Sequence, residues 1–402
     1  MVDSDSVDAA LNSIAMKFEG QYQTEAEDSE VGGWGQFLDG PRPHRQIGLY
    51  GTAAGLLVLS LADRTDTPCT CGATKLLHKW WREWRDSSAG YAKTKFCQNL
   101  RLAFSALCLR NTHNDMATTV AREIENEMLR RVGSRGRWGD YWVNPIIQDV
   151  APRYLATALT TLSLSVFGRP TDPVALAHIE HACAFLEQTL ATNSHLTATE
   201  KGVIAAAILA ASGTMKSRKA VRIVTTLAQS PESTLAEHHS YFYEYRFDGG
   251  GWDRDSIYLY GEIMIGIAGF LRGAPPELRL RGERTLVRVL ENISGEGFHP
   301  AEGVGRISTV EQAWCCLFLA LAKQSTENAV SRPKNIKYAL IRNRHDTLFT
   351  RTVIPLVAIL MVTYAMGLRL DSTAWIVFKG VASFIVFSLY GPSVIKRFFP
   401  GR

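Results

Sequence analysis

The stretch "LATALTTLSLSVF" (residues 155–167) contains small and apolar residues on every side of a helix and no charged residue. A helix of this composition has no face suited to water, which is typical of a helix surrounded by other helices. Similar runs recur about fifty residues apart along the chain, and such a period indicates a repeat architecture. The other five runs cover residues 51–62, 100–110, 201–212, 261–271 and 311–322.

Amphipathic segments separate these apolar runs. Their apolar residues recur at three- and four-residue spacing with charged residues opposite, the pattern of a helix with one solvated side. Together with an amphipathic helix at 6–18, they supply one outer helix for each buried one. We therefore predict an all-α fold, an (α/α)6 toroid without strands, which the helix at 6–18 closes by packing against residues 306–322. An open solenoid would need polar terminal caps, which the apolar first and last runs do not provide. The amphipathic segments are 73–84, 116–132, 173–190, 218–229 and 277–293.

The composition excludes some classes of partner. The chain of 402 residues carries a formal net charge of +5, and much of its basic character lies beside one segment near the C-terminus. We therefore expect no nucleic-acid partner. The seven cysteines are scattered, which is more typical of a reducing compartment than of a disulfide framework. We expect no cofactor and no metal, because Cys69, Cys71 and His78 give too few ligands at a recognised spacing.

Two apolar runs near the C-terminus, 352–368 and 373–395, are each close to the roughly 20 residues of a membrane-spanning helix. Basic residues precede the first run and follow the second, which predicts a two-pass protein of the cytoplasmic membrane with both termini in the cytoplasm. Membrane lipid around residues 352–395 is then a partner. The alternative is a helical hairpin buried in a soluble core. The predicted domains are a toroid at 1–328, a basic linker at 329–350 and a transmembrane hairpin at 351–397.

Glycine and aromatic residues mark the turns that lead into the apolar runs. The turns are "GGW" at 32–34, "GRW" at 136–138, "GGW" at 250–252 and "GEGF" at 295–298. With the helices that follow, they resemble the terpenoid-cyclase and protein-prenyltransferase superfamily of α/α-toroids over about residues 5–325. The resemblance implies an (α/α)6 ring, an isoprenoid or other lipidic substrate in the central cavity, and association with membranes.

The third of these turns contains the candidate catalytic acids. In "GGGWDRDS" (249–256), Asp253 and Asp255 resemble the acidic motif with which terpenoid cyclases protonate an alkene, although Ser256 replaces the last acid. The resemblance implies that Asp255 donates the proton and that Asp253 tunes its acidity. The alternative, which we favour, is that one of these aspartates caps the helix that follows.

Charged residues cluster at the expected mouth of the ring, where all six buried helices begin. Both signs of charge there favour a polar ligand, a peptide or a phosphate-bearing lipid over a plain hydrocarbon, while salt bridges between adjacent helices are the alternative. The segment 230–248, with His238 and His239, is expected to form a long loop that covers this rim. The candidate ligand-binding residues are Arg101, Asp149, Arg153, Trp252, Tyr258, Glu262 and Glu311.

Two functions of different class follow. The first, which we favour, is a membrane-anchored toroid that binds a ligand or a protein partner and transmits that state to the membrane hairpin. Such a protein would be a sensor, scaffold or effector, for example in bacterial defence. The second is a membrane-bound isoprenoid cyclase or prenyltransferase-like enzyme with its acid at Asp255.

Overall fold

The computed structural model describes residues 4–25, 30–39, 47–86, 99–112, 114–133, 136–139, 153–168, 170–246, 252–295, 297–299 and 307–331. The chain divides into two compact units, Met1–Glu327 and Asn328–Arg402, and the fold below is that of the first unit. The domain boundaries at 328 and 350 stay predictions.

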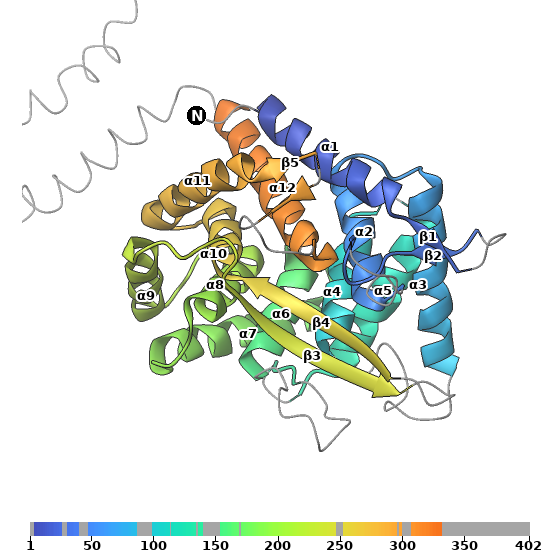
Figure 1. Cartoon of the computed structure of the whole chain (residues 1–402). Helices are drawn as coiled ribbons and strands as arrows, with labels where there is room; N and C mark the ends of the chain where they lie inside the picture. The colour runs from blue at the N-terminus through green and yellow to red at the C-terminus, as the bar shows by residue number, and fades with distance from the viewer. Residues whose placement is uncertain are drawn as a thin grey trace, which may run out of the picture. The chain divides into compact units, whose positions relative to one another are not determined.

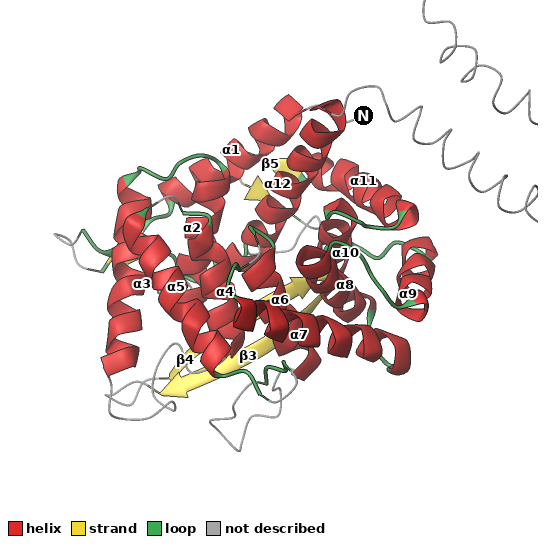
Figure 2. Ribbon diagram, turned by 180° about the vertical axis from the view of Figure 1, so that it is seen from behind, coloured by secondary structure: helices red, strands yellow, loops and turns green. Residues whose placement is uncertain are grey.

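Two layers of helices alternate along the described chain and form a ring (Figure 1; Figure 2). The mainly helical prediction and the alternation of inner and outer helices are confirmed. The inner helices are α2 (Leu49–Leu61), α4 (Asn99–Arg110), α6 (Arg153–Ser165), α8 (Ala198–Ser212), α10 (Gly261–Phe270) and α12 (Thr309–Ser331). The outer helices are α1 (Ser4–Gly20), α3 (Pro68–Asp86), α5 (Asp115–Arg130), α7 (Pro173–Thr192), α9 (Arg218–Gln229) and α11 (Pro276–Glu291).

Burial explains why the two layers differ in sequence. Every residue of α2 from Leu49 to Ser60 is buried, so no position of that stretch tolerates a charge. In α9 the buried residues are Ala220, Val224, Leu227 and Ala228, which lie on one face at helical spacing. In the sequence, inner helices therefore appear as continuous apolar runs, and outer helices appear as amphipathic segments.

The two ends of the ring meet, so the ring is closed as predicted, although α1 packs mainly on α2, α11 and the β5–β6 ribbon and not on residues 306–322. The Leu38 N–H donates to the Ile307 carbonyl at 2.9 Å, and the Thr309 N–H donates to the Gln36 carbonyl at 3.0 Å. On the outside, Lys323 Nζ of α12 lies 2.7 Å from Asp8 Oδ1 of α1. These contacts join the first helices to the last, which excludes the open solenoid.

Tryptophans in two of the glycine turns fasten an outer helix to the turn that follows it. Trp34 Nε1 donates to the Phe18 carbonyl near the end of α1 at 2.8 Å. Trp138 Nε1 donates to the Met128 carbonyl near the end of α5 at 2.7 Å. Both indoles are fully buried, so each fills space in the core and adds a second hydrogen bond to a carbonyl near the helix end.

The third glycine turn differs from the prediction. Residues around it form an antiparallel hairpin of β3 (His238–Arg246) and β4 (Trp252–Tyr260), in a register from His238↔Tyr260 to Arg246↔Trp252. The expected loop at 230–248 and the strand-free fold were therefore wrong. Two short ribbons also occur, β1 (Gln23–Thr24) with β2 (Gly32–Gly33) and β5 (Ile293–Ser294) with β6 (Gly297–Phe298).

The predicted helix cap is wrong for the same reason. Helix α10 begins at Gly261, and its N-cap residue is Tyr260, whose side chain makes no capping hydrogen bond. Asp253 and Asp255 lie in β4, several residues before the helix, so neither is placed to receive its first N–H groups.

The predicted membrane anchor also needs correction. Among the residues that the structure describes, no helix is both long and apolar enough to cross a bilayer. The three most apolar described helices are α10, α2 and α8, which are inner helices buried within the ring. The runs 352–368 and 373–395 lie outside the described residues. The two-pass location in the cytoplasmic membrane, with cytoplasmic termini, is therefore withdrawn.

Candidate functional site

The inner helices begin at one face of the ring, because each is followed by an outer helix that returns the chain to that face. The β3–β4 hairpin lies across this face in Figure 1 and leads directly into α10. Side chains from several inner helices and from the base of the hairpin gather here. We call this set the central cluster; its members are Tyr50, Arg101, Phe104, Tyr258, Tyr260, Glu311 and Trp314.

Aromatic rings of the central cluster connect three inner helices. The Tyr50 ring of α2 meets the Phe104 ring of α4 edge-on at 5.5 Å, and Phe104 meets the Trp314 ring of α12 at 5.4 Å. The Arg101 guanidinium lies 5.7 Å from the centre of the Tyr50 ring. Because α4 and α12 lie on either side of α2 in the ring, these side chains meet in its interior. They are almost completely buried.

The base of the hairpin is fastened to the same cluster. Trp314 Nε1 donates to the Tyr258 carbonyl at 2.9 Å, and Gln36 Nε2 donates to the Tyr258 hydroxyl at 3.0 Å. The exposed His238 ring lies 5.2 Å from the half-buried ring of Tyr258. Tyr258 therefore lies between the solvent-exposed surface and the buried part of the cluster.

Glu311, in the first turn of α12, is the chemically distinctive member. Burial raises the pKa of its carboxyl to about 8, although a backbone hydrogen bond at Ser308 opposes the shift. Its Oε1 is buried and has no hydrogen-bond partner in the described structure. Burial, Glu311 and Tyr258 also raise the pKa of the neighbouring Tyr260. Glu311 is therefore a neutral carboxylic acid at pH 7, which is the state of a general acid.

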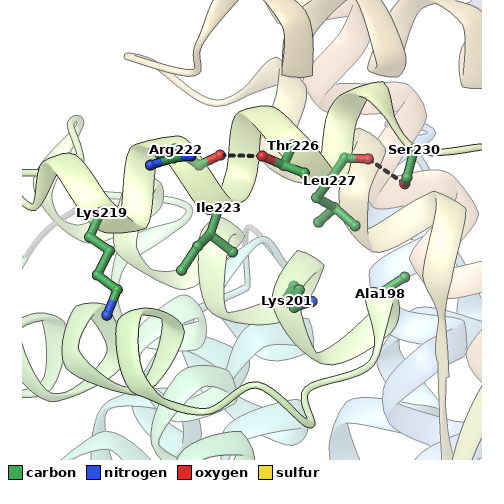
Figure 3. A pocket seen from close by; sticks show the side chains of 8 residues that line it. All are labelled: Ala198, Lys201, Lys219, Arg222, Ile223, Thr226, Leu227 and Ser230. Atoms are coloured by element: carbon green, nitrogen blue, oxygen red, sulfur yellow. Dashed lines mark hydrogen bonds between the residues drawn. The ribbon is translucent and has the colours of Figure 1, made fainter.

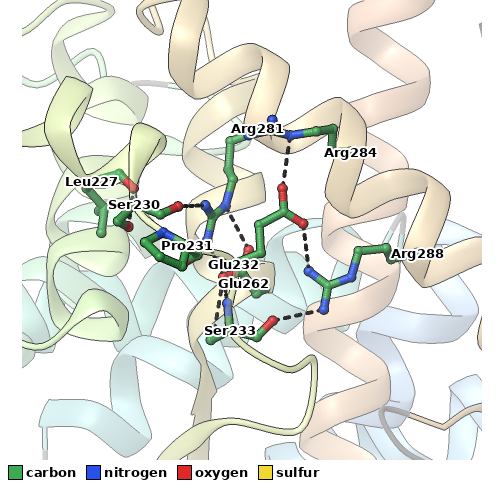
Figure 4. Close-up of polar contacts among 9 residues, drawn as sticks. All are labelled: Leu227, Ser230, Pro231, Glu232, Ser233, Glu262, Arg281, Arg284 and Arg288. Carbon is green, nitrogen blue, oxygen red and sulfur yellow. Dashed lines mark hydrogen bonds and ion pairs between the residues drawn. The ribbon is translucent and has the colours of Figure 1, made fainter.

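Glu262 has a different environment (Figure 4). Its Oε1 lies 2.5 Å from Arg281 Nη2 of α11, its Oε2 accepts from Arg281 Nε at 3.0 Å, and the ion pair is almost completely buried. The Ser233 N–H and hydroxyl also donate to Glu262 Oε1, at 2.9 and 3.0 Å. The same guanidinium donates to the carbonyls of Ser230 and Pro231. Glu262 thus holds the segment between α9 and the hairpin against α11.

The remaining predicted site residues are not brought into the cluster by any described contact. Arg153 is the first residue of α6 and is exposed. Trp252, Asp253 and Asp255 pair with Arg246, Tyr245 and Tyr243 in the register of the hairpin. Asp149 lies outside the described residues. The catalytic and ligand-binding roles of these residues, and of Arg101, Tyr258, Glu262 and Glu311, stay predictions.

Within the described part of the chain, no three His, Cys, Asp or Glu side chains come together as a metal site would require. Cys69 and Cys71 lie in α3 as free thiols, and burial raises the pKa of Cys69.

Sequence reasoning missed four members of the cluster, namely Tyr50, Phe104, Tyr260 and Trp314. A signal for three of them was present: each is a bulky aromatic residue in the first or second turn of an inner helix. Tyr260 had no such signal, because its position depends on the hairpin that the sequence analysis did not anticipate.

Comparison with known proteins gives no match to any family model or curated protein, but solved structures match over most of the ring. One is an inactive variant of the α-1,6-mannanase GH76A of Salegentibacter sp. HEL1_6 in complex with α-1,6-mannotriose. It has a TM-score of 0.51 and 14% identity, and the match covers 79% of this chain and 99% of that one. A second inactive variant, in complex with α-1,6-mannotetrose, has a TM-score of 0.50 at the same identity and coverage. This chain shares their fold.

The likeness overturns the resemblance to terpenoid cyclases and prenyltransferases, since the matched rings are glycoside hydrolases. Glycine–tryptophan turns help neighbouring helical hairpins to pack against one another. They therefore predicted the toroid architecture correctly, whereas the cyclase and prenyltransferase chemistry inferred from them was wrong. The favoured function, a membrane-coupled binding or sensing protein, is also contradicted, as is the isoprenoid-enzyme alternative.

Proposed function

We propose that the ring is a carbohydrate-active enzyme that binds an α-linked oligosaccharide at the face where its inner helices begin and hydrolyses a glycosidic bond. The observation that carries the proposal is Glu311, a buried carboxylic acid with a pKa of about 8 beside Tyr260. The fold agrees with this chemistry, because the similar rings are α-1,6-mannanases that hold α-1,6-mannotriose and α-1,6-mannotetrose.

Glycoside hydrolysis needs an acid that is still protonated at neutral pH. A glycosidic oxygen is a poor leaving group until it receives a proton, and the donor is commonly a carboxyl group whose pKa its surroundings raise. In this proposal Glu311 donates that proton as the bond between the anomeric carbon and the oxygen breaks. The half-buried ring of Tyr258, whose carbonyl accepts from Trp314 in the same cluster, provides an apolar surface for a sugar ring.

A second carboxylate must activate water or attack the anomeric carbon. Asp255 and Asp253 are candidates, because β4 carries both of them in the hairpin whose base contacts the cluster. Asp149 is a further candidate from its position in the sequence just before α6. Because Glu311 itself is only 2% exposed, we infer that substrate reaches it when the base of the hairpin, which carries Tyr258, moves away from Trp314.

The test is turnover of α-1,6-linked manno-oligosaccharides, followed by the release of reducing ends. We expect Glu311→Gln to bind mannotriose about as well as the wild type and to lose roughly 100-fold or more in kcat, because an amide cannot supply the proton. Glu200→Gln is the matched control. Glu200 is also a buried acid in the first turn of an inner helix, but it is engaged by Tyr154 and Thr197.

Asparagine substitutions at Asp149, Asp253 and Asp255 then identify the second carboxylate. The proposal is wrong if the folded wild-type protein neither binds nor cleaves these or other α-linked oligosaccharides, or if Glu311→Gln leaves kcat unchanged.

A further inference from the structure

A groove with a volume of about 590 Å³ lies between α9 and the beginning of α8. Because the two helices run in opposite directions, the end of α9 lies beside the start of α8. Figure 3 shows Ile223 and Leu227 pointing from α9 toward Ala198 and Lys201 of α8. None of the lining residues belongs to the central cluster. They are Ala198, Lys201, Lys219, Arg222, Ile223, Thr226, Leu227 and Ser230.

The groove is basic, and its charges are not neutralised within the described structure. Lys201, Lys219 and Arg222 line it, no carboxylate does, and no ion pair of any of the three is found among the described residues. Arg284 and Arg288 of α11 behave differently, since both pair with Glu232. Three cations around one hollow without a protein counter-charge favour an anion from outside the chain.

The rest of the lining is apolar. Leu227 is buried, Ile223 is half-buried, and Ala198 closes the groove at the start of α8. A fully hydrated anion would gain nothing from this surface, whereas an apolar group attached to the anion would leave water there. The volume lies within the range of about 300–1,000 Å³ that is usual for small-molecule sites.

We propose that this groove binds a small organic phosphate, with the phosphate near Lys201, Lys219 and Arg222 and an apolar body against Ile223 and Leu227. Lysine is a common phosphate-binding residue because its ammonium acts as a compact point charge, and arginine adds planar donors. The site is separate from the proposed glycosidase site, so either proposal can fail without the other.

The experiment is calorimetric titration of the full chain with octyl phosphate. We expect saturable binding that weakens at least about tenfold in Lys219→Glu and in Arg222→Glu, because each replaces an attraction with a repulsion at the groove. Both residues are exposed, so the variants are expected to fold, and thermal unfolding checks this. Arg218→Glu is the matched control. It makes the same charge change on an exposed residue of α9 that does not line the groove, and it should alter affinity by less than about threefold.

Two further probes separate the contribution of the phosphate group to binding from that of the octyl chain. Inorganic phosphate, which lacks the tail, and octanol, which lacks the charge, should each bind more weakly than octyl phosphate. The proposal is overturned if octyl phosphate does not bind, if octanol binds equally well, or if Arg218→Glu weakens binding as much as Lys219→Glu and Arg222→Glu do.

Discussion

Glu311 makes the stability of the folded ring depend on pH, because its carboxyl holds a proton more tightly in the folded chain than in the unfolded one. Its pKa rises from an ordinary value of 4.5 to about 8. The folded state therefore binds more protons between these values, and the free energy of unfolding falls as pH rises through that window. The contribution is fully present below pH 4.5 and is lost as pH rises through about 8.

We expect Glu311→Gln to match the wild type in stability near pH 5 and to exceed it above pH 8, by an amount on the order of 5 kcal/mol. The amide cannot ionise, so it escapes the cost of a buried charge. Urea unfolding at several pH values measures the difference. Curves that stay parallel from pH 5 to pH 9 would show that the carboxyl is not held neutral.

Arg281 and Glu262 illustrate the opposite case, a buried charge that is stabilised by its partner. Arg281→Met should destabilise the ring by about 3–5 kcal/mol, because it leaves the Glu262 carboxylate buried and unpaired. Arg284→Met is the control on the same helix, where the ion pair with Glu232 is half exposed and the expected cost is below about 1 kcal/mol. Equal losses in the two variants, measured by urea unfolding, would contradict this account.

At the scale of the element, the inner helices were predicted well from the sequence, whereas the hairpin was missed. The run 261–271 matches α10 at Gly261–Phe270 almost residue for residue, because a helix buried all round has a sequence unlike any other element. The hairpin had its own signal. "SYFYEYRF" at 240–247 is rich in strand-forming aromatic residues, and the glycines at 249–251 separate it from β4. The sequence analysis instead interpreted "GGW" at 250–252 as a turn into a helix, because it resembles the glycine–tryptophan turns at 32–34 and 136–138.

The candidate site could be predicted only in part. Charged residues at the starts of inner helices were visible in the sequence, and Arg101 and Glu311 were identified in this way. The pKa of Glu311 depends instead on burial by segments far away in sequence, such as the one containing Tyr260. The sequence immediately around Glu311 does not predict that burial.

The contribution of a glycine–tryptophan turn to stability can be tested at Trp138, which is hydrogen-bonded to α6. Thr157 Oγ1 of α6 accepts from the Trp138 N–H at 3.1 Å and donates to the Trp138 carbonyl at 3.0 Å. Thr157→Val removes both bonds and leaves two buried backbone groups without partners, so we expect a loss of about 1–3 kcal/mol.

Thr160→Val is the control for this turn. Thr160 is equally buried on the same helix, but its hydroxyl has no hydrogen-bond partner among the described residues. Its replacement should be neutral or slightly stabilising. Thermal unfolding of the two variants measures the contrast, and a Thr160→Val protein as unstable as Thr157→Val would refute it.

At the scale of the whole molecule, closure of the ring rests on packing of α1 more than on its ion pair. Ile14 is fully buried, whereas Asp8 and Lys323 are partly exposed. We expect Ile14→Ala to cost about 2–5 kcal/mol and Asp8→Asn less than about 1 kcal/mol. Denaturant midpoints of the two variants test this ranking, which would be reversed if the ion pair held the ends together.

The bonds between the segments around Gln36 and Thr309 also have a consequence during protein synthesis. They join residues 273 positions apart, so a ribosome that adds about 5–20 residues per second needs roughly 14–55 seconds to deliver the second partner after the first. Throughout that time the nascent chain is an incomplete arc with an apolar edge, which is the kind of surface that chaperones recognise. The yield of folded protein in a cell is therefore expected to respond to chaperone supply and translation speed, even for variants whose finished fold is stable.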